Sequence, residues 1–212
     1  MRVMSGYQTE EEQVEALKKW WKENGTSVIA GIVLGFGAVF GWQAWNGYQD
    51  RVGEEASVAF SQMIDAITQG QSESALKQAE LLRLEYESSA YAVFAALAQA
   101  SLKMEQGDSA AARSQLEWAM QHAEEPGLKQ LARLRLARIL LSEGETEAAA
   151  SLVKAASAGG FDSEFAALRG DIARQQGDLQ AARQAYQLAL AGDVGNGELV
   201  QMKLDDLGVA TP

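Results

Sequence analysis

Residues 25–49, GTSVIAGIVLGFGAVFGWQAWNGYQ, contain no charged side chain, and residues 28–45 within them are apolar except for Gln43. At about 1.5 Å per helical residue, the stretch from Val28 to Trp45 spans roughly 27 Å, close to the thickness of the hydrocarbon core of a bilayer. The stretch therefore predicts a single membrane-spanning helix over residues 25–49. It separates a short N-terminal segment, residues 1–24, from a large C-terminal part, residues 50–212.

A cleaved secretory signal peptide is the alternative, because it also has an apolar run near its N-terminus. Here, however, the preceding 24 residues mix acids with bases, and Trp42 and Trp45 lie where small residues would mark a cleavage site. Aromatic side chains flank both ends of the stretch, with Trp20 and Trp21 before it and Tyr48 after it, as in an interfacial belt. These features favour a retained anchor.

Basic residues near the apolar stretch predict its orientation. Lys18, Lys19 and Lys22 precede it, whereas Arg51 is the one basic residue in the roughly 20 residues that follow. Because lysine and arginine close to a span stay on the cytoplasmic side, we expect a cytoplasmic N-terminus and an exported C-terminal part. In a Gram-negative bacterium that part would be periplasmic. The absence of cysteine is compatible with an oxidising compartment but does not identify one.

The C-terminal part is strongly acidic. Residues 50–212 contain 14 basic and 24 acidic side chains, a net charge of −10 out of −11 for the whole chain. Binding of nucleic acid requires Lys and Arg clusters that neutralise phosphates, and anionic lipid surfaces repel an acidic domain. The charge therefore excludes nucleic acid as a partner. It leaves protein partners, or solubility alone, as its role.

The N-terminal segment predicts a short amphipathic helix at the cytoplasmic membrane surface. Thr9 fits the N-cap and Glu12 the capping-box position, and we expect Asn24-Gly25 to end the helix before the span. The apolar side chains that recur at helical spacing form one stripe, which consists of Val14, Leu17, Trp20 and Trp21.

The membrane-spanning stretch contains two overlapping G-x-x-x-G pairs. Small residues on one helix face allow a second helix to approach closely in lipid, although glycine is also simply common in membrane helices. Two pairs within 11 residues favour a lateral helix partner, without indicating whether that partner is a second copy. The predicted packing faces are Gly31, Gly35 and Ala38, and beside them Gly37, Gly41 and Ala44.

Small residues recur regularly in residues 50–212. Four glycines are spaced by 37, 37 and 33 positions: Gly70, Gly107, Gly144 and Gly177. Each has an alanine five positions later: Ala75, Ala112, Ala149 and Ala182. For the last three, small residues also occur seven positions before and twelve after: Ala100, Ala137 and Gly170, then Ala119, Ala156 and Ala189. Glycine turns with small residues at close helix crossings predict a solenoid of helical hairpins with a period of about 34 residues.

The composition agrees with an all-α fold, since the region is rich in alanine and the chain contains only Pro126 and Pro212. The repeat resembles the tetratricopeptide repeat, most clearly at residues 176–186, QGDLQAARQAY. It lacks the large aromatic early in each first helix and the closing proline, and the first unit fits least, with Met63 and Leu82 at small-residue positions. We expect four hairpins, over residues 54–86, 89–122, 127–157 and 162–191, and a capping helix over 196–207.

Residues suited to catalysis are nearly absent. The single histidine, His122, lies in a polar stretch at the end of a predicted helix, where it serves more often as a solvated side chain or a partner of the helix dipole. The chain has no cysteine nucleophile and no glycine loop for phosphate. We therefore predict no enzyme activity, no metal and no cofactor.

A binding groove is the remaining prediction. In repeats of this kind the first helix of each hairpin lines the concave side, which suits a peptide helix or an unfolded segment. The alternative is that the same side chains are packed between hairpins or under the final helix. The predicted groove residues are Phe94, Leu97, Met104, Leu131, Leu134, Arg138 and Leu141.

A family resemblance is carried by residues 13–21 (QVEALKKWW), 23–25 (ENG), Gly41-Trp42, Trp45-Asn46, 134–138 (LRLAR) and 202–204 (MKL). Through these residues the chain, from about residue 11 to 207, is similar to the ancillary SecYEG translocon subunit family (YfgM-like). The resemblance implies a single-pass protein of the bacterial inner membrane with a periplasmic repeat domain. It also implies association with the SecYEG translocon and with a membrane-anchored periplasmic chaperone of the prolyl-isomerase type, assisting newly exported proteins. An alternative role is regulation of an envelope-stress response through the cytoplasmic segment.

Overall fold

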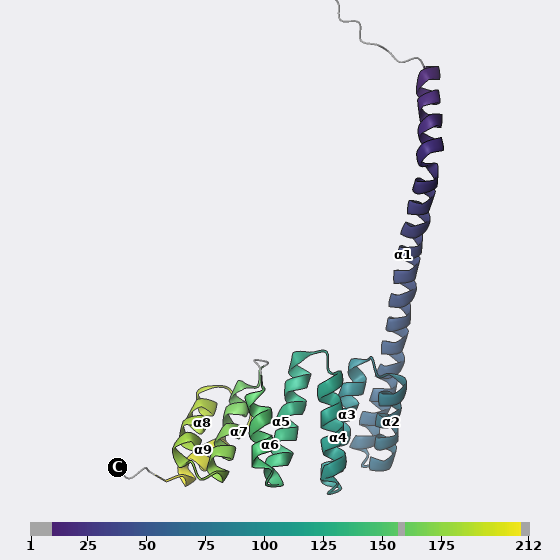
Figure 1. The fold of residues 1–212 in the computed structure, drawn as a ribbon. Coiled ribbons are helices and arrows are strands. Elements are labelled where there is room, and N and C mark those ends of the chain that lie inside the picture. Colours follow the sequence, from purple (N-terminus) through teal and green to yellow (C-terminus); the bar gives the residue numbers. More distant parts are fainter. Residues whose placement is uncertain (1–9, 157–159, 209–212) are drawn as a thin grey trace, which may run out of the picture. The chain divides into compact units, whose positions relative to one another are not determined.

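The computed structural model describes residues 10–156 and 160–208, and every regular element in these ranges is an α-helix (Figure 1). The chain divides into two compact units, Met1–Arg51 and Val52–Pro212. The helices are α1 (Glu10–Thr68), α2 (Ser72–Glu85), α3 (Ala90–Glu105), α4 (Ser109–His122), α5 (Pro126–Ser142), α6 (Thr146–Lys154), α7 (Asp162–Gln175), α8 (Leu179–Ala191) and α9 (Gly197–Asp206).

In the first unit, α1 contains the apolar stretch. Its large apolar side chains are exposed, Leu34 to 73% and Phe40 to 62%, although burying such side chains is worth about 1.5–3 kcal/mol each. Within the described residues, α1 is the one helix long and apolar enough to cross a membrane. It therefore fits a single-pass membrane anchor.

The predicted helix break at Asn24-Gly25 is wrong, because α1 passes through both residues. The Asn24 side-chain amide donates a hydrogen bond to the Trp20 carbonyl oxygen at 3.0 Å. The indole of Trp21 covers Gly25, since a Cβ at Gly25 would lie 3.3 Å from its ring. A glycine inside a helix costs only about 1 kcal/mol relative to alanine, so local contacts of this kind can outweigh it. The predicted N-cap, Thr9, lies outside the described residues.

The second unit is the predicted stack of helical hairpins (Figure 1). Val52–Thr68 of α1 forms the first hairpin with α2, and the pairs α3/α4, α5/α6 and α7/α8 follow, with α9 packed against α8. The boundaries agree with the predicted ones to within about two residues, except at the predicted start at residue 54, which lies inside α1, and in α6. That helix ends at Lys154, so Ala156 is only partly buried and does not occupy a helix crossing.

The four regularly spaced glycines end the first helix of each hairpin. All have positive φ, from +69° at Gly70 to +83° at Gly144, a conformation that costs L-residues with a side chain. At Gly107 the backbone forms a Schellman motif: the Gly107 N–H donates to the Met104 carbonyl and the Asp108 N–H donates to the Lys103 carbonyl. Helix α4 begins at Ser109, directly after Asp108, so α3 and α4 run antiparallel.

In two of the repeats the turn glycine is followed by an aspartate, and this aspartate caps the next helix. Asp108 Oδ1 accepts a hydrogen bond from the Ala111 N–H at 3.0 Å, and Asp178 Oδ1 accepts one from Ala181 at 2.9 Å. Each aspartate is thus the N-cap of a second helix. Gln71 and Glu145 occupy the equivalent positions without such a bond.

We expect Asp108→Ala to lower the free energy of unfolding by about 1 kcal/mol, because it removes an N-cap hydrogen bond. The matched change Gln71→Ala should stay within about 0.5 kcal/mol of the wild type, since no cap bond is lost there. Chemical unfolding followed by circular dichroism measures both. Equal effects at the two positions would contradict the assignment of Asp108 as a cap.

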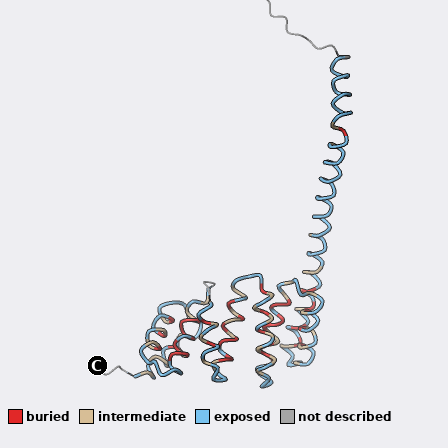
Figure 2. Tube along the Cα trace, viewed as in Figure 1, coloured by how far each residue is buried: buried red, intermediate tan, exposed pale blue. Residues whose placement is uncertain are grey.

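Small residues at the predicted crossings form the interior, which Figure 2 shows as buried segments along the facing sides of the helices. Among the alanines after the turns, Ala75, Ala112, Ala149 and Ala182 are all completely buried. Met63 and Leu82, the two departures in the first unit, are buried just as fully and pack together in one cluster. The first hairpin therefore accommodates larger side chains at positions where the later ones have alanine or glycine.

Candidate functional site

The structure separates the predicted groove residues into two groups. Leu97 and Leu134 are 4% and 1% exposed and belong to the largest hydrophobic cluster, and Leu131 packs against that cluster. Leu97 and Leu134 are core residues, so their assignment to a groove is wrong. The same cluster contains Leu116 of α4 and Val153 of α6. The other predicted residues are at least partly exposed: Phe94, Met104, Arg138 and Leu141.

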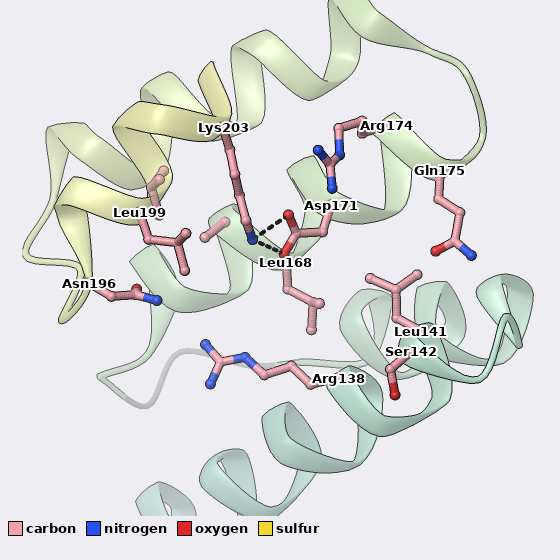
Figure 3. Close-up of a pocket in the computed structure, with 12 residues that line it drawn as sticks. Arg138, Leu141, Ser142, Leu168, Asp171, Arg174, Gln175, Asn196, Leu199 and Lys203 are labelled. Atoms are coloured by element: carbon pink, nitrogen blue, oxygen red, sulfur yellow. Dashed lines mark hydrogen bonds and ion pairs between the residues drawn. The ribbon is translucent and has the colours of Figure 1, made fainter. Parts of the chain in front are cut away.

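Arg138 and Leu141 line a hollow of about 620 Å³ between α5, α7 and α9 (Figure 3). Its apolar surface includes Leu141 from α5 and Leu199 from α9, and the buried Leu168 of α7 also borders it. Leu199 is 42% exposed, so the hollow is open to solvent there. Most of the other lining residues are polar or charged: Arg138, Ser142, Asp171, Arg174, Gln175, Asn196 and Lys203.

An ion pair between α9 and α7, to which a buried tyrosine of α8 is hydrogen-bonded, lies at the hollow. Lys203 Nζ lies 2.7 Å from Asp171 Oδ1 (Figure 3), and the Tyr186 hydroxyl donates to the same oxygen at 2.8 Å. The Tyr186 side chain is fully buried. Because α7, α8 and α9 each contribute one member, this network joins the last hairpin to the final helix. Sequence reasoning missed it, since the partners are 15 and 32 positions apart and have no spacing signal.

Burial, together with the hydrogen bond to Asp171, raises the pKa of the Tyr186 hydroxyl. The folded state thus favours the protonated phenol. Its contribution to stability is present below the ordinary tyrosine pKa of about 10 and is lost as the pH rises above it. We expect the melting temperature of the wild type to fall more steeply above about pH 10 than that of Tyr186→Phe. Parallel curves for the two proteins would contradict this linkage.

A second, smaller hollow of about 370 Å³ lies beside the first and shares Arg138 with it. Met104 and Arg135 also line it. Arg135 is partly buried and donates a hydrogen bond to the Leu97 carbonyl oxygen at 3.3 Å. Burial and the neighbouring charge of Arg138 lower the pKa of Arg135. The two hollows therefore form one adjoining pair along α3, α5, α7 and α9, with Arg138 between them.

Phe94 lies apart from these hollows. Its ring is 6.0 Å from that of Phe60, which is also 5.4 Å from Tyr91. The three rings form an aromatic cluster where α3 meets the end of α1. Phe94 is 38% exposed, so the cluster is only partly shielded from solvent.

The predicted helix-packing faces lie on the first unit. A side chain added at Gly31, Gly35, Gly37 or Gly41 would meet no atom within 4 Å. These faces, which include Ala38, are therefore unoccupied surface within the described residues. That is the condition under which a second helix could approach, and the approach itself stays a prediction.

His122 takes part in a structural contact. Its Nε2 lies 3.0 Å from Glu87 Oε1, its Nδ1 lies 2.9 Å from the Trp118 carbonyl oxygen, and its ring stacks on the Trp118 indole. These partners link the end of α4 to the turn between α2 and α3. Among the residues that the structure describes, no group of three or more His, Asp and Glu side chains is arranged to hold a metal ion.

Comparison with known proteins agrees with the resemblance found in the sequence. The tetratricopeptide repeat-like domain family matches residues 18–209. A protein of Escherichia coli (strain K12), named ancillary SecYEG translocon subunit, is 31% identical over 208 residues, which cover 97% of this chain and 100% of that protein. A protein of the same name from Haemophilus influenzae is 31% identical over 201 residues, which cover 93% of this chain and 97% of that protein. The chain therefore belongs to the tetratricopeptide repeat-like domain family and, within it, to the family of ancillary SecYEG translocon subunits.

Proposed function

We propose that this protein is a non-enzymatic accessory subunit of the Sec translocon, anchored in the inner membrane by residues 25–49. The observation that carries the proposal is the extent of the similarity, because it covers 97% of the chain and so includes both the apolar stretch and the repeats. Proteins that share both parts are named for association with SecYEG. In this proposal residues 1–24 are cytoplasmic and residues 50–212 are periplasmic.

The two units have different tasks in this proposal. The glycine faces of the span contact a translocon helix, since their open surface allows a close approach of backbones in lipid. The repeat domain holds a periplasmic chaperone of the prolyl-isomerase type, or newly exported clients, at the hollows of the first-helix face. Open hollows with apolar walls support this assignment, because repeat proteins commonly bind their partners on such surfaces.

Site-specific photocrosslinking in living cells tests both tasks. We expect a probe at Gly35 to crosslink to a translocon subunit, and a probe at Leu141, in the hollow, to crosslink to a chaperone or an exported client. A probe at Leu188 is the matched control, since Leu188 is 59% exposed on α8 and lines neither hollow. Crosslinks from Gly35 only to a second copy of this chain would overturn the translocon assignment. Equal crosslinks from Leu141 and Leu188 would overturn the assignment of the hollow.

A second candidate function is regulation of an envelope-stress response through the N-terminal segment. It is favoured by the apolar stripe at the start of α1, where Leu17 is 64% and Trp21 51% exposed. An exposed stripe suits a cytoplasmic partner as well as a membrane surface. Deletion of residues 9–21 with the span retained should change the output of a stress reporter if this function holds. An unchanged reporter would remove it.

A further inference from the structure

The charge of the two hollows is opposite to that of the domain around them. Of the charged residues that line them, four are basic, Arg135, Arg138, Arg174 and Lys203, and one is acidic, Asp171. The surrounding residues 50–212 have a net charge of −10. Solubility would account for acidic residues spread over the surface, but it does not account for basic side chains gathered at one hollow.

Two of these basic groups are not used by the fold. Lys203 is neutralised by Asp171, and Arg135 donates to a backbone carbonyl. By contrast, Arg138 and Arg174 form no ion pair or side-chain hydrogen bond with any residue in the described ranges 10–156 and 160–208. Both are exposed, and Figure 3 shows Arg138 extending from α5 toward the side formed by α7 and α9.

The other groups that line this hollow suit a polypeptide. Leu141 and Leu199 offer apolar surface, and the side-chain amides of Gln175 and Asn196 line the same hollow. An amide both donates and accepts, so it can hydrogen-bond to peptide N–H and C=O groups. A phosphate group alone would occupy the cations and could accept from these amides, but it would leave the apolar surface of Leu141 and Leu199 without a partner.

We propose that the hollow between α5, α7 and α9 binds a polypeptide segment in which acidic side chains flank an apolar one. The guanidinium groups of Arg138 and Arg174 each bind a carboxylate in the bidentate geometry that arginine favours, and the apolar side chain packs against Leu141 and Leu199. This inference rests on the proposed function for the source of the segment, a protein exported or anchored beside the translocon.

The test uses the full-length chain in detergent micelles and a fluorescent synthetic peptide with the pattern acid, leucine, acid. A matched peptide has glutamine and asparagine in place of the acids. Anisotropy titrations should show that the acidic peptide binds about tenfold more tightly than the neutral one, since hydrogen bonds between charged partners are stronger than those between neutral ones. The difference should shrink at high salt.

Arg138→Glu should weaken the acidic peptide by about tenfold or more. The matched control is Arg169→Glu, which makes the same charge change on α7 at an exposed residue that lines neither hollow, and it should leave affinity within about twofold. Arg138→Gln with Arg174→Gln gives a milder version if the reversal disturbs folding, which circular dichroism reports.

Three results would overturn the proposal. The first is equal binding of the acidic and neutral peptides, and the second is an equal loss of affinity in Arg138→Glu and Arg169→Glu. The third is binding of soluble short-chain phosphatidylglycerol that depends on Arg138, without binding of the acidic peptide, which would assign the hollow to a lipid headgroup. Co-purification of translocon subunits with the wild type tests the proposed function independently of the peptide titration. Its failure would leave the peptide measurement intact.

Discussion

Gly170→Ala is expected to destabilise the repeat domain by about 1–3 kcal/mol, the usual cost of overpacking a closely packed interior. A Cβ at this position would lie 2.4 Å from both Cδ1 and Cε1 of Tyr186, well inside van der Waals contact. The ring cannot move away easily. It is completely buried, and its hydroxyl is held by Asp171 at 2.8 Å. The clash with the Tyr186 ring should outweigh the gain of up to about 1 kcal/mol in helix propensity from glycine to alanine.

Gly127→Ala is the matched control for this change. Gly127 is also helical, but a Cβ there would meet only Glu125 Oε1, at 3.6 Å, which is an ordinary contact. We expect this variant to be as stable as the wild type or slightly more stable, because only the propensity gain remains. Chemical unfolding of both variants measures the difference.

A double variant tests the mechanism of the Gly170 effect. Tyr186→Leu removes the ring that the new methyl group would strike, so Gly170→Ala should cost less in that background than in the wild type. Additive losses in the double variant would show that the crowding of Tyr186 is not the cause. A stable Gly170→Ala protein would show that α7 and α8 can separate at little cost.

The turns and crossings could be predicted from the sequence because each depends on residues close together in the chain. The αL glycine and the aspartate after it act within one turn, as Gly107 and Asp108 do. Small residues recur at fixed offsets from that turn because adjacent hairpins cross in the same way. Gly170 was predicted as a crossing position on this basis, and the structure shows that the ring of Tyr186 is what it accommodates.

Other features could not be predicted, because they depend on which residues approach one another across the stack. The network of Tyr186, Asp171 and Lys203 joins three helices and leaves no periodic trace. At Asn24-Gly25 the sequence indicated a break, but contacts with Trp20 and Trp21 maintain the helix. Both features depend on side-chain contacts that local propensity does not describe.

The groove prediction identified part of the candidate site. The predicted residues lie on first helices, α3 and α5. Both helices are covered on more than one side, so the location of a residue on one of them does not by itself distinguish core from surface. Arg138 and Leu141 line a hollow, whereas Leu134 is buried in the main cluster. The polar residues Arg174, Gln175 and Asn196 were missed, since they have no apolar periodicity.

The difference between Leu134 and Leu141 leads to the prediction with the largest effect. Leu134→Ala should lower the free energy of unfolding by about 2–5 kcal/mol, because it leaves a cavity in the packed interior. Leu141→Ala should cost about 1 kcal/mol or less, as a partly exposed side chain loses fewer contacts, while weakening the acidic peptide. Chemical unfolding and anisotropy titration of the two variants separate these effects. Peptide binding that depended on Leu134 in a fully folded protein would contradict the assignment of Leu134 to the core, and an unchanged affinity in Leu141→Ala would remove Leu141 from the site.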